Sequence, residues 1–221
     1  TSGNRDEIEL AQKTYYDFFG RQATGYRAPI GAITRDGIAS LMDLGIRYDA
    51  SVFPSIRPGR NGYWNTRMPI TPFRVRHEER SILEFPFPTL PAIRLNFGLA
   101  WIKLYGLGLS SVLMRLFPPP YIIPFTTHPH DLYAPHLSDG VTPAEKAAMT
   151  RNSEHGFNIL EVMIDRFHGM GYEFAFMSDI CDYVDSLPDL PSMPLAEWHY
   201  YLFKDFPWRQ NSKNSSKNMP N

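Results

Sequence analysis

Residues 24–51 constrain the fold of this chain more than any other stretch, because they predict a strand, a helix and a second strand in close succession. The first strand should end near Arg27. Pro29 disfavours helix in the residue before it, and Gly31 permits a sharp turn. An arginine is therefore expected at the carboxyl end of a short strand.

A helix should follow this turn and lead directly into the second strand. Thr34 can cap the helix, and Gly45 suits the position after its last turn. Apolar residues recur at helical spacing between them, at Ile38, Leu41, Met42 and Leu44. This order favours a right-handed crossover in a parallel sheet, where chemistry gathers at the carboxyl ends of the strands. Arg27 and Asp49 both take that position, although Arg27 could simply pair with a neighbouring carboxylate to hold a loop.

Arg27-Ala28-Pro29, with residues 44–54 after it, resembles the third motif region of the polysaccharide deacetylases, carbohydrate esterase family 4. Two later segments agree. Residues 126–129, Thr-Thr-His-Pro, resemble the strand-end histidine motif, and residues 171–178 resemble the closing strand of the family. The resemblance runs from about residue 4 to about residue 184, with a poorly matched middle. It implies an α/β fold, the C-terminal portion of a distorted (β/α) barrel.

The resemblance also implies a function: hydrolysis of carbon–nitrogen bonds other than peptide bonds, removing N-acetyl groups from amino sugars of a polysaccharide or glycolipid. His128 would protonate the leaving amine, and Arg27 would orient an ionised aspartate. The backbone N–H of Ile30, in a turn fixed by Pro29, would stabilise the oxyanion. Glu84 falls where the fourth motif is expected and is a weaker candidate for substrate binding, because the usual Asp and Trp arrangement is absent.

The metal site of the family is not expected in this chain. In the family, two earlier motifs carry the catalytic aspartate and the metal ligands. Here no Asp-Asp pair occurs, and no His-x-x-x-His spacing precedes Arg27. A divalent metal, zinc by resemblance, is therefore expected only in a longer protein, and this chain alone should be inactive. A metal trio of His128, His130 and His136 is disfavoured, because alternate residues of an extended chain point to opposite faces.

Composition bounds the remaining questions. The chain has 221 residues, 43% of them hydrophobic, enough for one domain over residues 1–206. Residues 207–221 lie in an Asn-, Ser- and Lys-rich end that is expected to be disordered. A net charge of −1 gives no electrostatic case for binding nucleic acid. No charged and then apolar leader follows the first residue, a threonine, which favours a fragment. The compartment stays open.

Residues 93–117 form the most apolar stretch and must be tested as a membrane span. Arg94, Lys103 and Arg115 interrupt it, so no transmembrane helix is predicted. A helix that covers the barrel is expected, with its leucines buried and these charged residues outward. A surface segment that contacts a membrane or the lipid part of a substrate is the alternative.

Other segments give shorter predictions. Residues 55–80, rich in Pro, Gly, Arg and aromatics, predict a loop that either stacks on sugars or covers the fold irregularly. Strands are expected at 81–88, 121–127 and 172–177, and a capping box at 142–145 predicts a helix.

The competing function is a barrel without metal that binds a glycan or a protein partner. The coding sequence upstream of Thr1 would decide between the two.

Overall fold

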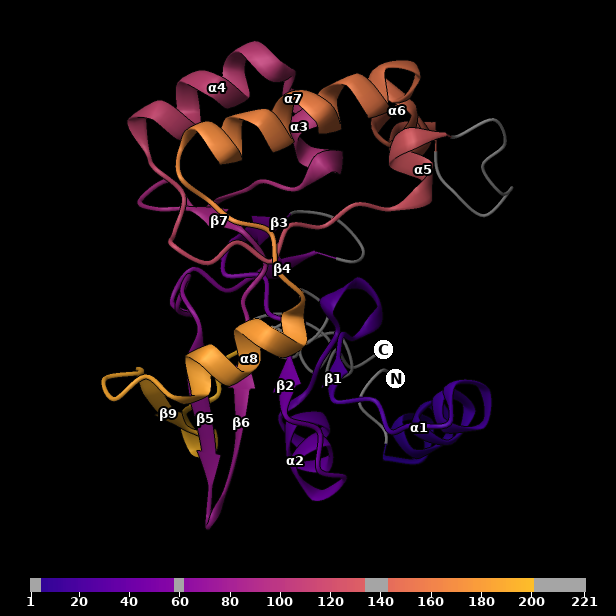
Figure 1. Cartoon of the computed structure of the whole chain (residues 1–221), viewed down its shortest axis with the longest axis vertical. Helices are drawn as coiled ribbons and strands as arrows, with labels where there is room; N and C mark the ends of the chain where they lie inside the picture. Colours follow the sequence, from indigo (N-terminus) through magenta and orange to yellow (C-terminus); the bar gives the residue numbers. More distant parts are fainter. Residues whose placement is uncertain (1–4, 58–61, 134–142, 201–221) are drawn as a thin grey trace, which may run out of the picture. The chain divides into compact units, whose positions relative to one another are not determined.

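The computed structural model describes residues 5–57, 62–133 and 143–200 (Figure 1). It divides the chain into two compact units. The first unit contains residues 1–86 and 178–221, and the second contains residues 87–177. The fold is mixed α/β with parallel strands, which confirms the predicted class. The prediction of one domain over residues 1–206 stays a prediction.

The first unit is built on a five-stranded sheet in the order β1-β2-β6-β5-β9 (Figure 1). Its strands are β1 (Gly25–Tyr26), β2 (Tyr48–Asp49), β5 (Phe73–His77), β6 (Arg80–Glu84) and β9 (Ser192–Pro194). β1, β2 and β6 run parallel, β5 pairs antiparallel with β6, and β9 pairs parallel with β5. The register aligns Tyr26 with Asp49 and Asp49 with Glu84, so three strands end at the same edge.

The predicted strand, helix, strand unit is confirmed. Helix α2 (Arg35–Asp43) begins after Thr34, whose hydroxyl accepts a hydrogen bond from the Gly37 N–H at 3.0 Å. Gly45 follows the helix with φ +70°, a left-handed conformation that favours glycine. Ile38 and Leu41 of α2 are buried in the core of the unit, which also contains Phe73 and Val75 of β5 and Ile82 of β6.

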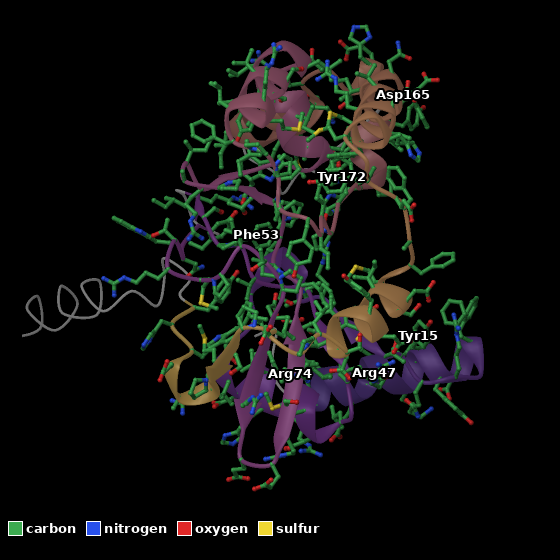
Figure 2. The ribbon with its side chains drawn as sticks, turned by 60° about the vertical axis from the view of Figure 1, so that its left-hand side comes forward. Tyr15, Arg47, Phe53, Arg74, Asp165 and Tyr172 are labelled. Atoms are coloured by element: carbon green, nitrogen blue, oxygen red, sulfur yellow. The ribbon has the colours of Figure 1, made fainter. Side chains whose placement is uncertain are left out.

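The rest of the first unit covers or extends this sheet. Helix α1 (Arg5–Phe19) precedes β1, and α8 (Met177–Asp185) precedes β9. Arg47 and Arg74, both labelled in Figure 2, form ion pairs with Asp182 and Asp185 of α8 at 2.5 and 2.8 Å. The predicted loop of residues 55–80 contains an antiparallel pair, β3 (Ile56–Arg57) with β4 (Tyr63–Trp64). Its last part forms strand β5 of the main sheet, so the loop prediction was wrong there. The short helices η1 (Pro29–Gly31) and η3 (Leu195–Glu197) complete the unit.

The second unit is mainly helical. Its elements are β7 (Thr89–Leu90), β8 (Leu95–Asn96), α3 (Leu99–Tyr105), α4 (Leu107–Leu116), α5 (Pro129–Leu132), α6 (Pro143–Thr150), η2 (Ser153–His155) and α7 (Gly156–Gly169). β7 and β8 pair antiparallel. Its core gathers buried residues of α3, α4 and α7, among them Leu99, Ile102, Met114, Ile159, Met163 and Phe167. Helix α6 lies where the capping box predicted a helix.

Two predicted strands do not form. Residues 121–127 and 172–176 carry no strand. In the first segment Pro124 lacks an N–H, and three prolines at 118–120 precede it, so a continuous ladder of backbone hydrogen bonds is prevented. In the second, Phe174 and Phe176 are 56% and 79% exposed, so their side chains are not packed as those of a buried strand would be.

The expectation for residues 93–117 was wrong in two respects. The segment forms two helices rather than one, because the chain turns at Gly106, which has φ +84°. Lys103, expected outward, is 1% exposed, whereas Leu109 and Leu116 are 53% and 65% exposed. No single helix among the described residues is long and apolar enough to cross a membrane; the bent pair of α3 and α4, with 109° between the two helices, passes that test on length and composition alone.

Candidate functional site

The turn from Arg27 to Gly31 lies at the carboxyl edge of the parallel strands. β1 ends at Tyr26, and Pro29–Gly31 form the single turn η1 immediately after it. Proline at the first position of this turn fixes φ and removes an N–H that would have no partner there. The sequence thus ends β1 and places Arg27 beside the ends of β2 and β6.

Two buried attachments hold this turn in place. On one side the Ala28 N–H donates to Ser51 Oγ at 2.7 Å, and the Ser51 hydroxyl donates to Asp49 Oδ1 at 2.6 Å. On the other side the Tyr200 hydroxyl donates to the Gly31 carbonyl at 2.7 Å. Both Asp49 and Ser51 are completely buried. The backbone of the turn is therefore fixed relative to β2 by residues distant in the sequence.

Ile30 is the strained residue of the turn. Its φ of +53° and ψ of +15° lie in the left-handed region, which is costly for a β-branched residue. Its side chain is 50% exposed. Among the described residues, none accepts a hydrogen bond from the Ile30 N–H, whereas the N–H groups of Gly31, Ala32 and Ile33 all donate to carbonyls of the turn. The turn therefore leaves one backbone donor available.

Asp49 and Glu84 form a buried carboxyl pair at the same edge. They are aligned across β2 and β6, and both are 0% exposed. Glu84 Oε1 accepts the Val52 N–H at 3.0 Å, while Asp49 Oδ1 accepts from Ser51. No donor within the described ranges serves Asp49 Oδ2 or Glu84 Oε2. A single proton held between the two carboxyl groups accounts for both oxygens.

The electrostatics of the pair support a shared proton. Burial raises the pKa of Asp49, and burial together with the charge of Asp49 raises the pKa of Glu84 well above its usual range. Arg27 lies within electrostatic reach of both carboxyl groups. Desolvation lowers the pKa of Arg27 and the two carboxylates oppose this, yet the side chain keeps contact with solvent, so its guanidinium stays charged. One negative charge on the pair balances one positive charge on Arg27.

In the second unit, His128 lies directly before the short helix α5. Its backbone N–H donates to Asp131 Oδ2 at 2.9 Å, and its ring Nδ1 lies 3.4 Å from the same oxygen. The His128 side chain is 54% exposed, while Asp131 is 1% exposed. The buried carboxylate thus fixes the backbone of an exposed histidine and lies beside one of its ring nitrogens.

Lys103 forms a buried ion pair with Asp131. Its Nζ lies 3.4 Å from Asp131 Oδ1 and donates to Ser153 Oγ at 2.9 Å and to the Met149 carbonyl at 3.2 Å. Burial by itself would raise the pKa of Asp131, but the hydrogen bonds from His128 and the positive charge of Lys103 outweigh it, and the pKa is lowered. Asp131 is therefore an ionised carboxylate at neutral pH.

The sequence suggested that the rings of His128 and His130 point to opposite faces of the chain, and this expectation was wrong. Because the chain turns into α5, the rings of His128 and His130 stack with centroids 5.0 Å apart and planes 13° from parallel. Together with Asp131 they place ligand atoms within 4.8 Å of one another. His136 lies outside the described residues.

This cluster does not fit a catalytic zinc ion. Zinc in a catalytic site takes three protein ligands with converging lone pairs and keeps a position open. The Asp131 carboxylate is already occupied by Lys103 and by the His128 backbone. The rings of His128 and His130 lie in nearly parallel planes, and a nitrogen lone pair lies in the plane of its ring, so the lone pairs of the two rings do not converge on one point. The described residues of this cluster therefore do not form a converging site of three ligands.

The structure gathers most of the predicted site residues at one edge. Arg27, Pro29, Ile30 and Glu84 surround the ends of β1, β2 and β6. His128 belongs to the second unit, so the shared catalytic site that the family resemblance implies for Arg27 and His128 stays a prediction, as does contact of the buried Glu84 with a substrate.

Sequence reasoning missed four polar residues of these sites: Ser51, Lys103, Asp131 and Tyr200. A lysine within an apolar run and an aspartate three residues after His128 were visible signals for two of them. Nothing local marks Tyr200, whose partner Gly31 is 169 positions away.

Comparisons with known proteins identify the fold. No protein-family model matches the chain, and no curated protein matches it. A solved structure of a protein from Mycobacterium smegmatis that is assigned to the polysaccharide deacetylases is similar to it, with a TM-score of 0.50 and 16% sequence identity. The match covers 86% of this chain and 58% of the M. smegmatis chain, so this chain spans little more than half the length of that protein. At this identity the likeness concerns the fold.

Proposed function

We propose that this chain is part of a hydrolase that removes N-acetyl groups from amino sugars of a polysaccharide or glycolipid, and that its sheet forms part of a distorted (β/α) barrel. The observation that carries the proposal is the strained turn at Ile30, which holds an unused backbone N–H beside Arg27 at the carboxyl edge of parallel strands. The fold likeness to the M. smegmatis protein supports it.

Each residue has a role that follows from its chemistry. Addition of water to an acetamide carbonyl creates an oxyanion, and the Ile30 N–H is a donor available to stabilise it. Collapse of that intermediate needs a proton on the departing nitrogen, which the exposed His128 ring can supply. Arg27 would hold a general-base carboxylate in its ionised form through a charge-assisted hydrogen bond.

Zinc and the general base would come from a longer protein of which this chain is a part, since the histidine cluster in the described residues does not fit the metal. When bound, zinc would supply polarisation of the carbonyl and activation of the water. The proposal therefore assigns binding and proton transfer to this chain, and predicts that the chain alone is inactive.

The test compares this chain with a version extended by its upstream coding sequence. Acetate release from chitin oligosaccharides and zinc titration by calorimetry are measured on both. The extended protein should bind zinc and turn over, and His128→Ala should lower kcat by about 10²- to 10⁴-fold without changing zinc affinity. If this chain alone binds one zinc ion per molecule and releases acetate, its metal site lies within these residues and the proposed assignment of the active site is wrong.

The non-catalytic alternative gives a different result in the same assay. An extended protein that binds chitin oligosaccharides but releases no acetate at any zinc concentration would be a glycan-binding barrel.

A further inference from the structure

The outward face of helix α4 is aliphatic. Leu109, Val112 and Leu116 are 53%, 53% and 65% exposed, whereas Ser110 and Met114 are buried. The three aliphatic residues fall on one side of a helix of 3.6 residues per turn. A helix at the surface of a globular protein usually directs its polar residues outward and its apolar residues inward. In α4 the polar Ser110 is buried, and the three aliphatic side chains of this stripe are exposed.

Charge around α4 is one-sided. The sequence contains no Asp or Glu from Phe85 to His130. Arg115 is exposed on the outward side of α4, and Arg166 of α7 hydrogen-bonds Ser111 of α4, which brings a second guanidinium to this helix. The exposed Glu161 and Asp165 belong to α7, on which Figure 2 labels Asp165. Helix α4 itself therefore carries an aliphatic stripe, an exposed arginine and no carboxylate.

Helix α3 does not share this face. Its residues Leu99, Ile102 and Lys103 are all buried, and the first two belong to the core of the second unit. The axes of α3 and α4 differ in direction by 109°. A surface contact made by α4 alone therefore leaves the core of the unit intact, whereas insertion of both helices would expose the buried Lys103–Asp131 pair to lipid.

We propose that α4 binds the surface of an anionic lipid bilayer, with its aliphatic stripe at the boundary between headgroups and acyl chains. A stripe of three aliphatic side chains flanked by arginines and free of carboxylates is the pattern of an interfacial helix on anionic lipid. Tyr121, which is 56% exposed shortly after α4, adds an aromatic side chain of the type that is enriched at membrane interfaces. This inference concerns binding and does not depend on the proposed catalytic function.

Vesicle flotation of the full chain tests the proposal. The probes are vesicles of phosphatidylcholine alone and of phosphatidylcholine mixed with phosphatidylglycerol. The chain should float with the mixed vesicles, and less at high salt, because the arginine contribution is screened. Leu109→Glu/Leu116→Glu should weaken the binding about tenfold or more, and Leu109→Ser/Leu116→Ser should weaken it without adding negative charge.

The matched control is Phe157→Glu/Ile164→Glu on α7. These side chains are 67% and 36% exposed, are also seven residues apart, and change the net charge equally. The control should retain vesicle binding, and circular dichroism should show native folding for every variant. Absence of wild-type flotation, or an equal loss in the control, would overturn the proposal. So would a concentration-dependent dimer in light scattering that only the α4 variants dissociate, because α4 would then bind a second copy of the chain.

Discussion

Asp49 and Glu84 face each other across parallel strands β2 and β6 with no exposed surface, and Arg27 lies within electrostatic reach of both. Two carboxylates in such a site cannot both ionise cheaply, so the folded chain retains a proton that the unfolded chain releases. The carboxyl edge of this sheet is therefore sensitive to pH through groups that solvent does not touch.

The first prediction is that the free energy of unfolding of Glu84→Gln increases relative to that of the wild type as pH rises. The raised pKa of Glu84 means that the folded state binds more protons than the unfolded state above about pH 4, so the wild type loses stability as pH increases through the folded pKa. Glutamine keeps the acceptor for the Val52 N–H and can donate to Asp49. Urea unfolding at a series of pH values measures this. The exposed Glu79→Gln is the control, and a stability difference that does not grow with pH would contradict the shared proton.

The second prediction concerns the two glycines with nearly equal φ. A Cβ on Gly31, at φ +69°, would lie 2.4 Å from the Phe53 ring and 2.7 Å from the Ser51 carbonyl, while a Cβ on Gly45, at φ +70°, meets nothing within 4 Å. Gly45→Ala should cost about 1 kcal/mol through backbone conformation alone. Gly31→Ala should cost more than about 2 kcal/mol, because the turn must move. Equal losses in thermal unfolding would show that the turn is not held as described.

The local pattern predicted β1, α2 and β2 because every signal there agrees. A capping threonine, helical spacing and a C-terminal glycine all lie within about 20 residues, and the packing of the helix confirms each of them. The same kind of reasoning failed at residues 172–176. There the resemblance to the closing strand of the family suggested a strand, but strand formation depends on a partner elsewhere in the chain, which no local pattern reveals.

The residues of the candidate sites also fall into two groups: those that a local motif predicted, and those whose contacts are distant in the sequence. Arg27, Pro29 and Ile30 were predicted because one short motif contains them. Tyr200 was missed because its contact with Gly31 is non-local, and Lys103 was placed outward because a lysine in an apolar run usually extends its amine to solvent. Burial of Lys103 becomes favourable only with Asp131 and Ser153 as partners, which the fold brings together from three separate segments.

The third prediction is that Lys103→Met strongly destabilises the second unit. Removing the ammonium leaves the Asp131 carboxylate buried opposite a methyl group, and such losses cost about 3–5 kcal/mol. The double variant Lys103→Met/Asp131→Asn should be more stable than Lys103→Met alone, because no charge is then left buried without a partner. Lys146→Met, on the exposed side of α6, is the control and should change the free energy of unfolding by less than about 0.5 kcal/mol. A single variant as stable as the control would mean that Asp131 does not need its cation.

The last prediction is that Asp131 stabilises the fold only while it is ionised, with the opposite pH dependence from Glu84. The pKa of Asp131 is lowered in the folded chain, so its stabilising effect is fully present above the unfolded value of about 3.9 and is lost as pH falls through the folded value. Asp131→Asn should therefore be less stable than the wild type at neutral pH, and this difference should shrink in acid.

Urea unfolding of both proteins from neutral pH downward measures that difference directly. General acid destabilisation acts on both proteins and cancels in the comparison. Asp165→Asn, on the exposed face of α7, should show no such trend. If the gap between wild type and Asp131→Asn stays constant down to about pH 3, the carboxylate is not held by Lys103 and His128 as the geometry requires.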